Sequence, residues 1–176
     1  MSDNVNSKDK DIEGPVHPQT RIGHVHLKVS DLERSVQFYT QVLGFELQQR
    51  FGNSAAFLSA GGYHHHIGLN TWESRGAPPP PRYSTGLYHF AILYPSRLEL
   101  ARALARIIAH GWPIDGASDH GVSEAIYLHD PDGNGIEIYR DRDPSEWPRD
   151  NGRIAMVTDP LDLDDLLGEL ERAASA

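Results

Sequence analysis

The same order of secondary-structure patterns occurs twice in this chain, and this repeat restricts the possible folds more than any other feature. In the first copy, a strand, a helix and three strands are expected at residues 24–29, 31–43, 45–50, 55–59 and 65–70. In the second copy, the same elements are expected at residues 88–93, 97–110, 114–117, 124–129 and 135–139. A β-α-β-β-β unit therefore recurs with a period of about 65 residues.

Matching start and stop signals mark the two predicted helices. Ser30 and Ser96 each open an S-x-L-E capping box, and Gly44 and Gly111 stand where a helix ends. Each helix would cover one face of the sheet in its own module. We expect an α+β fold in which two βαβββ modules form a cupped, barrel-like mixed sheet with the helices outside.

The expected domain organisation follows from composition along the chain. Residues 1–19 are polar and contain two prolines, which indicates a flexible N-terminal arm. The main domain is expected at residues 20–140, with modules at 20–75 and 86–140 and a proline linker at 76–85. The tail, residues 141–176, should contain a short amphipathic helix that packs on the outside of the cup or on a partner chain.

Charge and cysteine content exclude several classes of function. Sixteen basic residues against 25 acidic ones give a net charge of −9, which argues against nucleic-acid and anionic-membrane partners. The absence of cysteine excludes disulfides, thiolate metal sites and thiol nucleophiles. No apolar run reaches the length of a membrane span, and the N-terminus lacks the apolar core of a secretory signal. A cytoplasmic location is expected.

Residues 123–139 combine a strand, a tight D-P-D-G-N-G turn and a second strand that carries Glu137. Glu137 alternates with two isoleucines, so its carboxylate faces the inside of the cup and needs a cation or a donor. His24 and His89 occupy matching places in the two modules and point to the same side. Two imidazoles and a carboxylate suit a divalent metal such as Fe(II), and Mn(II), Ni(II) or Zn(II) are alternatives. Backbone-bonded histidines and an ion-paired carboxylate are the alternative interpretation.

This arrangement resembles the vicinal oxygen chelate superfamily, which includes glyoxalases, fosfomycin- and bleomycin-resistance proteins and extradiol dioxygenases. The resemblance covers about residues 21–140 and implies that His24, His89 and Glu137 hold a metal. The position that carries a carboxylate ligand in glyoxalase I corresponds to Gly68. This departure counts against glyoxalase I and leaves three protein ligands.

Residues 120–137 are similar to the signature of extradiol ring-cleaving dioxygenases. The matching residues are His120, Ile126, Tyr127, Asp130, Pro131, Gly133 and Glu137. Ser118 departs from the residues that the signature prefers two positions before the histidine. The resemblance implies that His120 and Tyr127 are catalytic and hydrogen-bond the oxygens of the substrate and of dioxygen.

The run His64-His65-His66-Ile67-Gly68 resembles an extradiol pattern whose second histidine is the acid/base, which implies that role for His65. On a regular strand, however, His64 and His66 share the face of Gly68. A local bulge would resolve this conflict in favour of His65.

The resemblance as a whole implies a metal-dependent extradiol dioxygenase of the catechol 2,3-dioxygenase kind. Its substrates would be a small aromatic diol and O2, and a homodimer is expected. Alternatives are another metal-dependent member of the superfamily, such as an isomerase, epimerase, lyase or resistance transferase, and a non-catalytic module that binds a small molecule.

Overall fold

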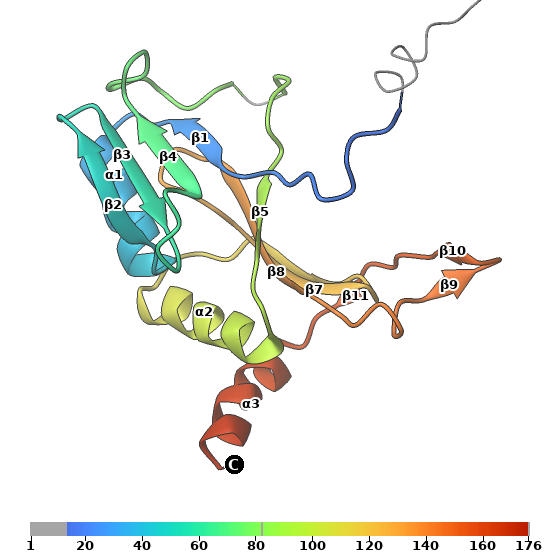
Figure 1. The fold of residues 1–176 in the computed structure, drawn as a ribbon. Coiled ribbons are helices and arrows are strands. Elements are labelled where there is room, and N and C mark those ends of the chain that lie inside the picture. Colours follow the sequence, from blue (N-terminus) through green and yellow to red (C-terminus); the bar gives the residue numbers. More distant parts are fainter. Residues whose placement is uncertain (1–13, 82, 176) are drawn as a thin grey trace, which may run out of the picture.

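Two separate mixed sheets, each with a helix on one side, form the body of the protein in a computed structural model that describes residues 14–81 and 83–175 (Figure 1). The first sheet has the order β1 (Val25–Lys28), β4 (Ile67–Asn70), β3 (Ala55–Ser59), β2 (Glu46–Phe51). The second has the order β11 (Asp159–Pro160), β6 (Gly116–Asp119), β7 (Ser123–His129), β8 (Gly135–Asp141), β5 (Phe90–Leu93). The predicted α+β class with outer helices is confirmed, and the described strands form no closed barrel.

The remaining elements are three helices, one π-helical turn and one small hairpin. They are α1 (Leu32–Gln37), the turn η1 (Phe38–Val42), α2 (Arg97–Ala109), α3 (Leu163–Ala174), β9 (Arg149–Asp150) and β10 (Arg153–Ile154). No helix among the described residues is long and apolar enough to cross a membrane. Most of the arm predicted at residues 1–19 lies outside the described residues, as does residue 82 of the predicted linker.

The start of the second helix agrees with the sequence, whereas the start of the first is shifted by one residue. Ser96 caps α2 by accepting a hydrogen bond from the amide of Glu99. In α1 the cap is Asp31, which accepts from the amide of Arg34. The hydroxyl of Ser30 instead donates to the carboxylate of Asp132, in the other module, and accepts from the side chain of Arg34.

Strand register confirms the predicted equivalence of Gly68 and Glu137. In the parallel pair β1 and β4, His26 lies opposite Gly68. In the parallel pair β5 and β8, Ala91 lies opposite Glu137. His24 lies two residues before His26, and His89 lies two residues before Ala91. Because side chains two positions apart share a face, His24 belongs to the face of Gly68 and His89 to the face of Glu137.

A turn of the second module holds the helix of the first. Asp130 is 4% exposed, and its carboxylate accepts hydrogen bonds within the turn D-P-D-G-N-G. The donors are the backbone amides of Asp132 and Asn134 and the side-chain amide of Asn134. The fully buried hydroxyl of Tyr39, in η1, also donates to it at 2.9 Å. Asp132 accepts from Ser30, Arg34 and Ser35 around α1. We call these contacts the inter-module clamp.

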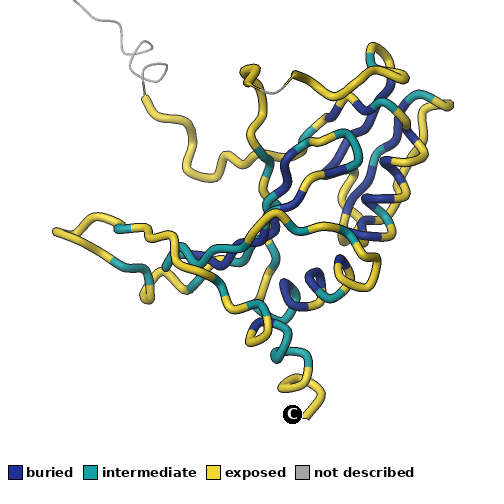
Figure 2. Tube along the Cα trace, turned by 180° about the vertical axis from the view of Figure 1, so that it is seen from behind, coloured by how far each residue is buried: buried dark blue, intermediate teal, exposed yellow. Residues whose placement is uncertain are grey.

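The predicted tail helix is α3, and it packs on α2 on the outside of the fold. Leu166 is fully buried in the main apolar core, and further leucines of α3 pack against that core. Buried residues follow the sheets and the inner side of α2, whereas the β9–β10 hairpin is exposed and projects from the body (Figures 1 and 2). Within this one chain, α3 thus packs outside the sheets, against α2.

Candidate functional site

The second module brings an imidazole, a carboxylate and a phenol together. Nε2 of His89 lies 2.9 Å from Oε2 of Glu137, whose side chain is 14% exposed. Tyr127 lies directly across from Glu137 in the pairing of β7 with β8, and its hydroxyl is 3.4 Å from Oε1. Among the described residues, no lysine or arginine forms a salt bridge with this carboxylate. Glu137 is thus a shielded anion with one imidazole beside it.

His120 extends this cluster. It directly follows β6, and its Nε2 lies 2.8 Å from the hydroxyl of Tyr127. Its Nδ1 lies 2.8 Å from the carbonyl oxygen of Val157. Burial, and next the charge of Glu137, raise the pKa of Tyr127 to about 12, so the phenol keeps its proton at neutral pH. Four of the six residues singled out from the sequence therefore form one connected set.

The other two predicted residues lie beside each other on the first module. The rings of His24 and His65 have centroids 4.4 Å apart, and His65 also contacts the edge of Phe57. Because β4 begins only at Ile67, His65 precedes the regular strand and strand alternation does not restrict its direction. Burial, and next the charges of His24 and His64, lower the pKa of His65. This imidazole is therefore neutral at neutral pH and can accept a proton.

Within residues 14–81 and 83–175, no group of three or more histidine, aspartate or glutamate side chains could hold a metal ion. His89 and Glu137 provide two adjacent donors of the predicted set, while His24 belongs to the separate cluster on the first module. The donor chemistry suits a divalent metal, since a neutral imidazole and a shielded carboxylate are common ligands. One chain in this conformation provides two of the three predicted ligands as neighbours.

Two residues of the site were not predicted from the sequence. The ring of His26 covers Gly68 so closely that a Cβ atom at residue 68 would lie 3.0 Å from Cγ of His26. A side chain at residue 68 would therefore require the ring of His26 to shift. Alternation in the strand could have indicated His26, since it shares the face of His24. Val157 contributes a backbone carbonyl, which leaves no signal in the sequence.

Comparison with known proteins identifies the family of this chain. The profile of the Glyoxalase/Bleomycin resistance protein/Dioxygenase superfamily matches residues 21–138, which include both modules. The chain belongs to this superfamily. The match includes all six predicted site residues and ends before Val157.

Relatives in this superfamily carry different names. A protein of Bacillus subtilis (strain 168) named catechol-2,3-dioxygenase is 47% identical over 156 residues, which cover 88% of this chain and 53% of the relative. A glutathione transferase FosA of Serratia marcescens is 28% identical over 118 residues, which cover 67% of this chain and 79% of the relative. This chain thus spans about half the length of its dioxygenase relative.

A solved structure of the superfamily shares the fold. The structure of a glyoxalase/dioxygenase from Nostoc punctiforme matches with a TM-score of 0.58 and 22% identity, over 74% of this chain and 98% of that one. The superfamily fold thus accounts for most of the chain, and the C-terminal part beyond residue 138 lies outside the matched profile.

Proposed function

We propose that this chain is the catalytic domain of a metal-dependent extradiol dioxygenase that opens a catechol-type aromatic diol with O2. The observation that carries this proposal is the chain of contacts from His120 through Tyr127 to Glu137, with separations of 2.8 and 3.4 Å. The extradiol reaction uses such a histidine–phenol pair beside the ligand carboxylate, whereas the alternative isomerase, epimerase and transferase reactions do not call for it. The dioxygenase name of a relative at 47% identity supports the same assignment.

The residues that would hold the metal are His24, His89 and Glu137. When bound, Fe(II) would supply Lewis acidity toward the diol and redox chemistry toward O2, and Mn(II), Ni(II) and Zn(II) suit the same donors. His65, whose pKa is lowered, would accept a proton from a substrate hydroxyl. The Tyr127 hydroxyl, with His120 bonded to it, would orient an oxygen atom of the substrate beside Glu137.

A homodimer is part of the proposal because one chain does not place His24 beside the other two ligands. The inter-module clamp, including the buried bond from Tyr39 to Asp130, stabilises the present arrangement of the two modules. Both β1 and β5 are edge strands with a free side, and His24 and His89 directly precede them. A second copy can approach these edges without disturbing the clamp and can supply its own His24.

Anaerobic loading with Fe(II), followed by oxygen uptake with a panel of catechols, tests the proposed function. We expect stoichiometric O2 consumption and a yellow ring-opened product. A metal-loaded protein that consumes no O2 with any diol would contradict the proposal and favour another reaction of the superfamily. Protein that binds no divalent metal would also contradict it and would favour a module that binds small molecules without chemistry.

A further inference from the structure

The chain beyond the superfamily match returns to the candidate site. We call residues 147–160 the C-terminal strap; it includes the projecting β9–β10 hairpin and the short strand β11 (Figure 1). Within it, β11 pairs in antiparallel fashion with β6, so that Asp159 lies opposite Asp119. The strap therefore adds an edge strand next to β6, the strand that leads directly into His120.

Val157 makes two hydrogen bonds to the same histidine. Its amide donates to the backbone carbonyl of His120 at 3.1 Å, and its own carbonyl lies 2.8 Å from Nδ1 of the ring. The backbone bond fixes the distance between strap and histidine, so the ring contact is not an incidental approach of a free side chain. The other ring nitrogen, Nε2, contacts Tyr127.

The strap packs closely against Gly121, the residue after His120. Gly121 has φ +72°, and a Cβ atom there would lie 2.7 Å from Cγ of Pro148 and 3.4 Å from Cγ2 of Val157. The chain can approach this closely only because residue 121 has no side chain.

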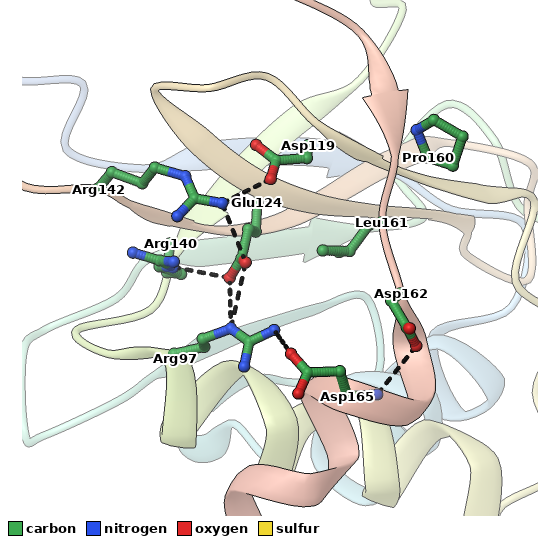
Figure 3. Close-up of a pocket in the computed structure, with 9 residues that line it drawn as sticks. All are labelled: Arg97, Asp119, Glu124, Arg140, Arg142, Pro160, Leu161, Asp162 and Asp165. Atoms are coloured by element: carbon green, nitrogen blue, oxygen red, sulfur yellow. Dashed lines mark hydrogen bonds and ion pairs between the residues drawn. The ribbon is translucent and has the colours of Figure 1, made fainter. Parts of the chain in front are cut away.

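Ion pairs fix the elements on either side of the strap to the second sheet (Figure 3). Arg142, before the strap, pairs with Asp119, the residue that precedes His120. After the strap, Asp165 of α3 pairs with Arg97, which also contacts the buried carboxylate of Glu124. Both ends of the strap are therefore tied to groups that are themselves held by β6, β7 and α2.

We propose that the Val157 carbonyl is a positioning group that holds His120 in the tautomer protonated at Nδ1 and thereby presents an unprotonated Nε2 to Tyr127. A carbonyl oxygen only accepts hydrogen bonds, so the 2.8 Å contact requires the proton on Nδ1. In a neutral ring, Nε2 then has a lone pair and accepts the hydroxyl proton of Tyr127. That proton is directed toward the nearer partner, Nε2 of His120 at 2.8 Å, and away from Oε1 of Glu137 at 3.4 Å.

The meaning of this tautomer for catalysis rests on the proposed dioxygenase function, whereas the tautomer itself does not. With Nε2 accepting from the phenol, Tyr127 can take a proton from a substrate hydroxyl while its own proton moves to Nε2 of His120, and the reverse transfers return it. With the opposite tautomer, Nε2–H would donate to the phenol and the Tyr127 proton would turn to the carboxylate. The strap therefore selects the direction of the hydrogen bonds around the candidate metal ligand.

The direct test is nitrogen-15 NMR of the full chain with labelled histidine, without metal and without substrate. The His120 signals are assigned by their loss in His120→Gln. We expect the pattern of a ring protonated at Nδ1 and unprotonated at Nε2, coupled to the Tyr127 hydroxyl. A His120 ring protonated at Nε2, or an equal mixture of tautomers, would overturn the proposal. Because no turnover is involved, a protein without dioxygenase activity can still pass this test.

Two perturbations test whether Val157 is responsible. An ester in place of the amide between Val157 and Thr158, carried inside a synthetic 155–176 segment that is ligated to the rest of the chain, weakens the carbonyl as an acceptor without changing any side chain. It should shift His120 toward the other tautomer; an unchanged ratio would overturn the assignment to this carbonyl.

Gly121→Ala should displace the strap and shift the tautomer ratio in the same direction. Gly111→Ala is the matched control, since Gly111 also has positive φ, at +62°, but a Cβ atom there meets nothing within 4 Å. A shift in Gly121→Ala alone supports the proposal. No shift in either variant, or equal shifts in both, would overturn it. If Gly121→Ala does not fold, the ester variant decides.

Discussion

Nε2 of His89 and Oε2 of Glu137 lie 2.9 Å apart, where His89 directly precedes β5 and Glu137 lies on β8. Each residue comes from a different end of the second module, and the parallel pairing of β5 with β8 brings them together. The carboxylate is largely shielded from water, where an anion needs a partner. A bound metal ion would take the place of the His89 N–H group as that partner.

Glu137→Gln should abolish Fe(II) binding. The amide keeps the size of the side chain but loses the negative charge that binds a divalent cation, so we expect at least about 100-fold weaker binding, since losing even an outer-shell partner costs 10–100-fold. Iron content after anaerobic loading measures the effect. Glu46→Gln, at an exposed position of β2, is the control and should retain full iron content. Full occupancy in Glu137→Gln would remove this residue from the ligand set.

His65→Ala should leave iron bound but reduce kcat by about 100-fold or more, because it removes the candidate general base and no ligand. The matched control is His66→Ala. Nδ1 of His66 accepts a bond from the amide of Ala60 and its ring contacts Phe45 and Tyr63, away from the His24 ring. Steady-state oxygen uptake compares the two variants. Normal turnover in His65→Ala with a loss in His66→Ala would transfer the role to His66.

The sequence predicted the parts of this molecule that depend on local periodicity. The two modules, their strand order and the equivalence of Gly68 with Glu137 follow from alternation and spacing, which nearby residues dictate. The neighbours His89, Glu137 and Tyr127 could be predicted for the same reason, since they belong to one hairpin and its adjacent strand.

Features that depend on contacts between distant segments could not be predicted in this way. Ser30 bonds Asp132 across the modules, and Asp31 rather than Ser30 caps α1. The same clamp sets how the two sheets lie relative to each other, and this separates His24 from the other ligands. The contact of Val157 with His120 uses a backbone atom, which any residue type could provide.

Mixing two inactive variants should restore activity if the site is shared between copies. His24→Ala and Glu137→Ala each remove a ligand from every site of a homodimer. After subunit exchange, the mixed dimer would contain one site with both changes and one intact site. About one quarter of wild-type activity per chain is expected for random pairing. Oxygen uptake before and after exchange measures it. If neither the mixed variants nor the co-expressed pair regains activity, His24 acts within its own chain or not at all.

Tyr39→Phe should lower the free energy of unfolding by about 2 kcal/mol, because it removes one hydrogen bond to a buried carboxylate and fills the same space. Asp130 would keep its bonds from the turn, so the turn itself should survive. Urea denaturation measures the loss. Tyr63→Phe, at a half-exposed ring, is the control and should change stability by less than about 0.5 kcal/mol. A similar small change in Tyr39→Phe would show that the clamp adds little to folding.

Arg97→Met should loosen α3 and destabilise the chain by about 2 kcal/mol at pH 7, because Glu124 is buried and loses one of its charged partners. Glu124 would keep its contacts with Arg140 and Arg142, which limits the loss. Arg102→Met, on the same helix but exposed and paired only with Glu99 among the described residues, is the control. Its effect should stay within about 0.5 kcal/mol.

The effect of Arg97→Met should also depend on pH. A hydrogen bond from Arg97 lowers the pKa of Asp165 below its ordinary value of 3.8, and bonds from Arg172 and then Arg97 lower that of Glu169 below 4.5. A carboxylate whose pKa falls on folding contributes stability above its ordinary pKa, and this contribution disappears as pH falls through the lowered value. The stability gap between wild type and Arg97→Met should therefore be largest above pH 4.5 and narrow below pH 3.8. Urea denaturation at a series of pH values measures this gap. A gap that stays constant across the series would show that Arg97 acts through packing rather than through its charge on α3.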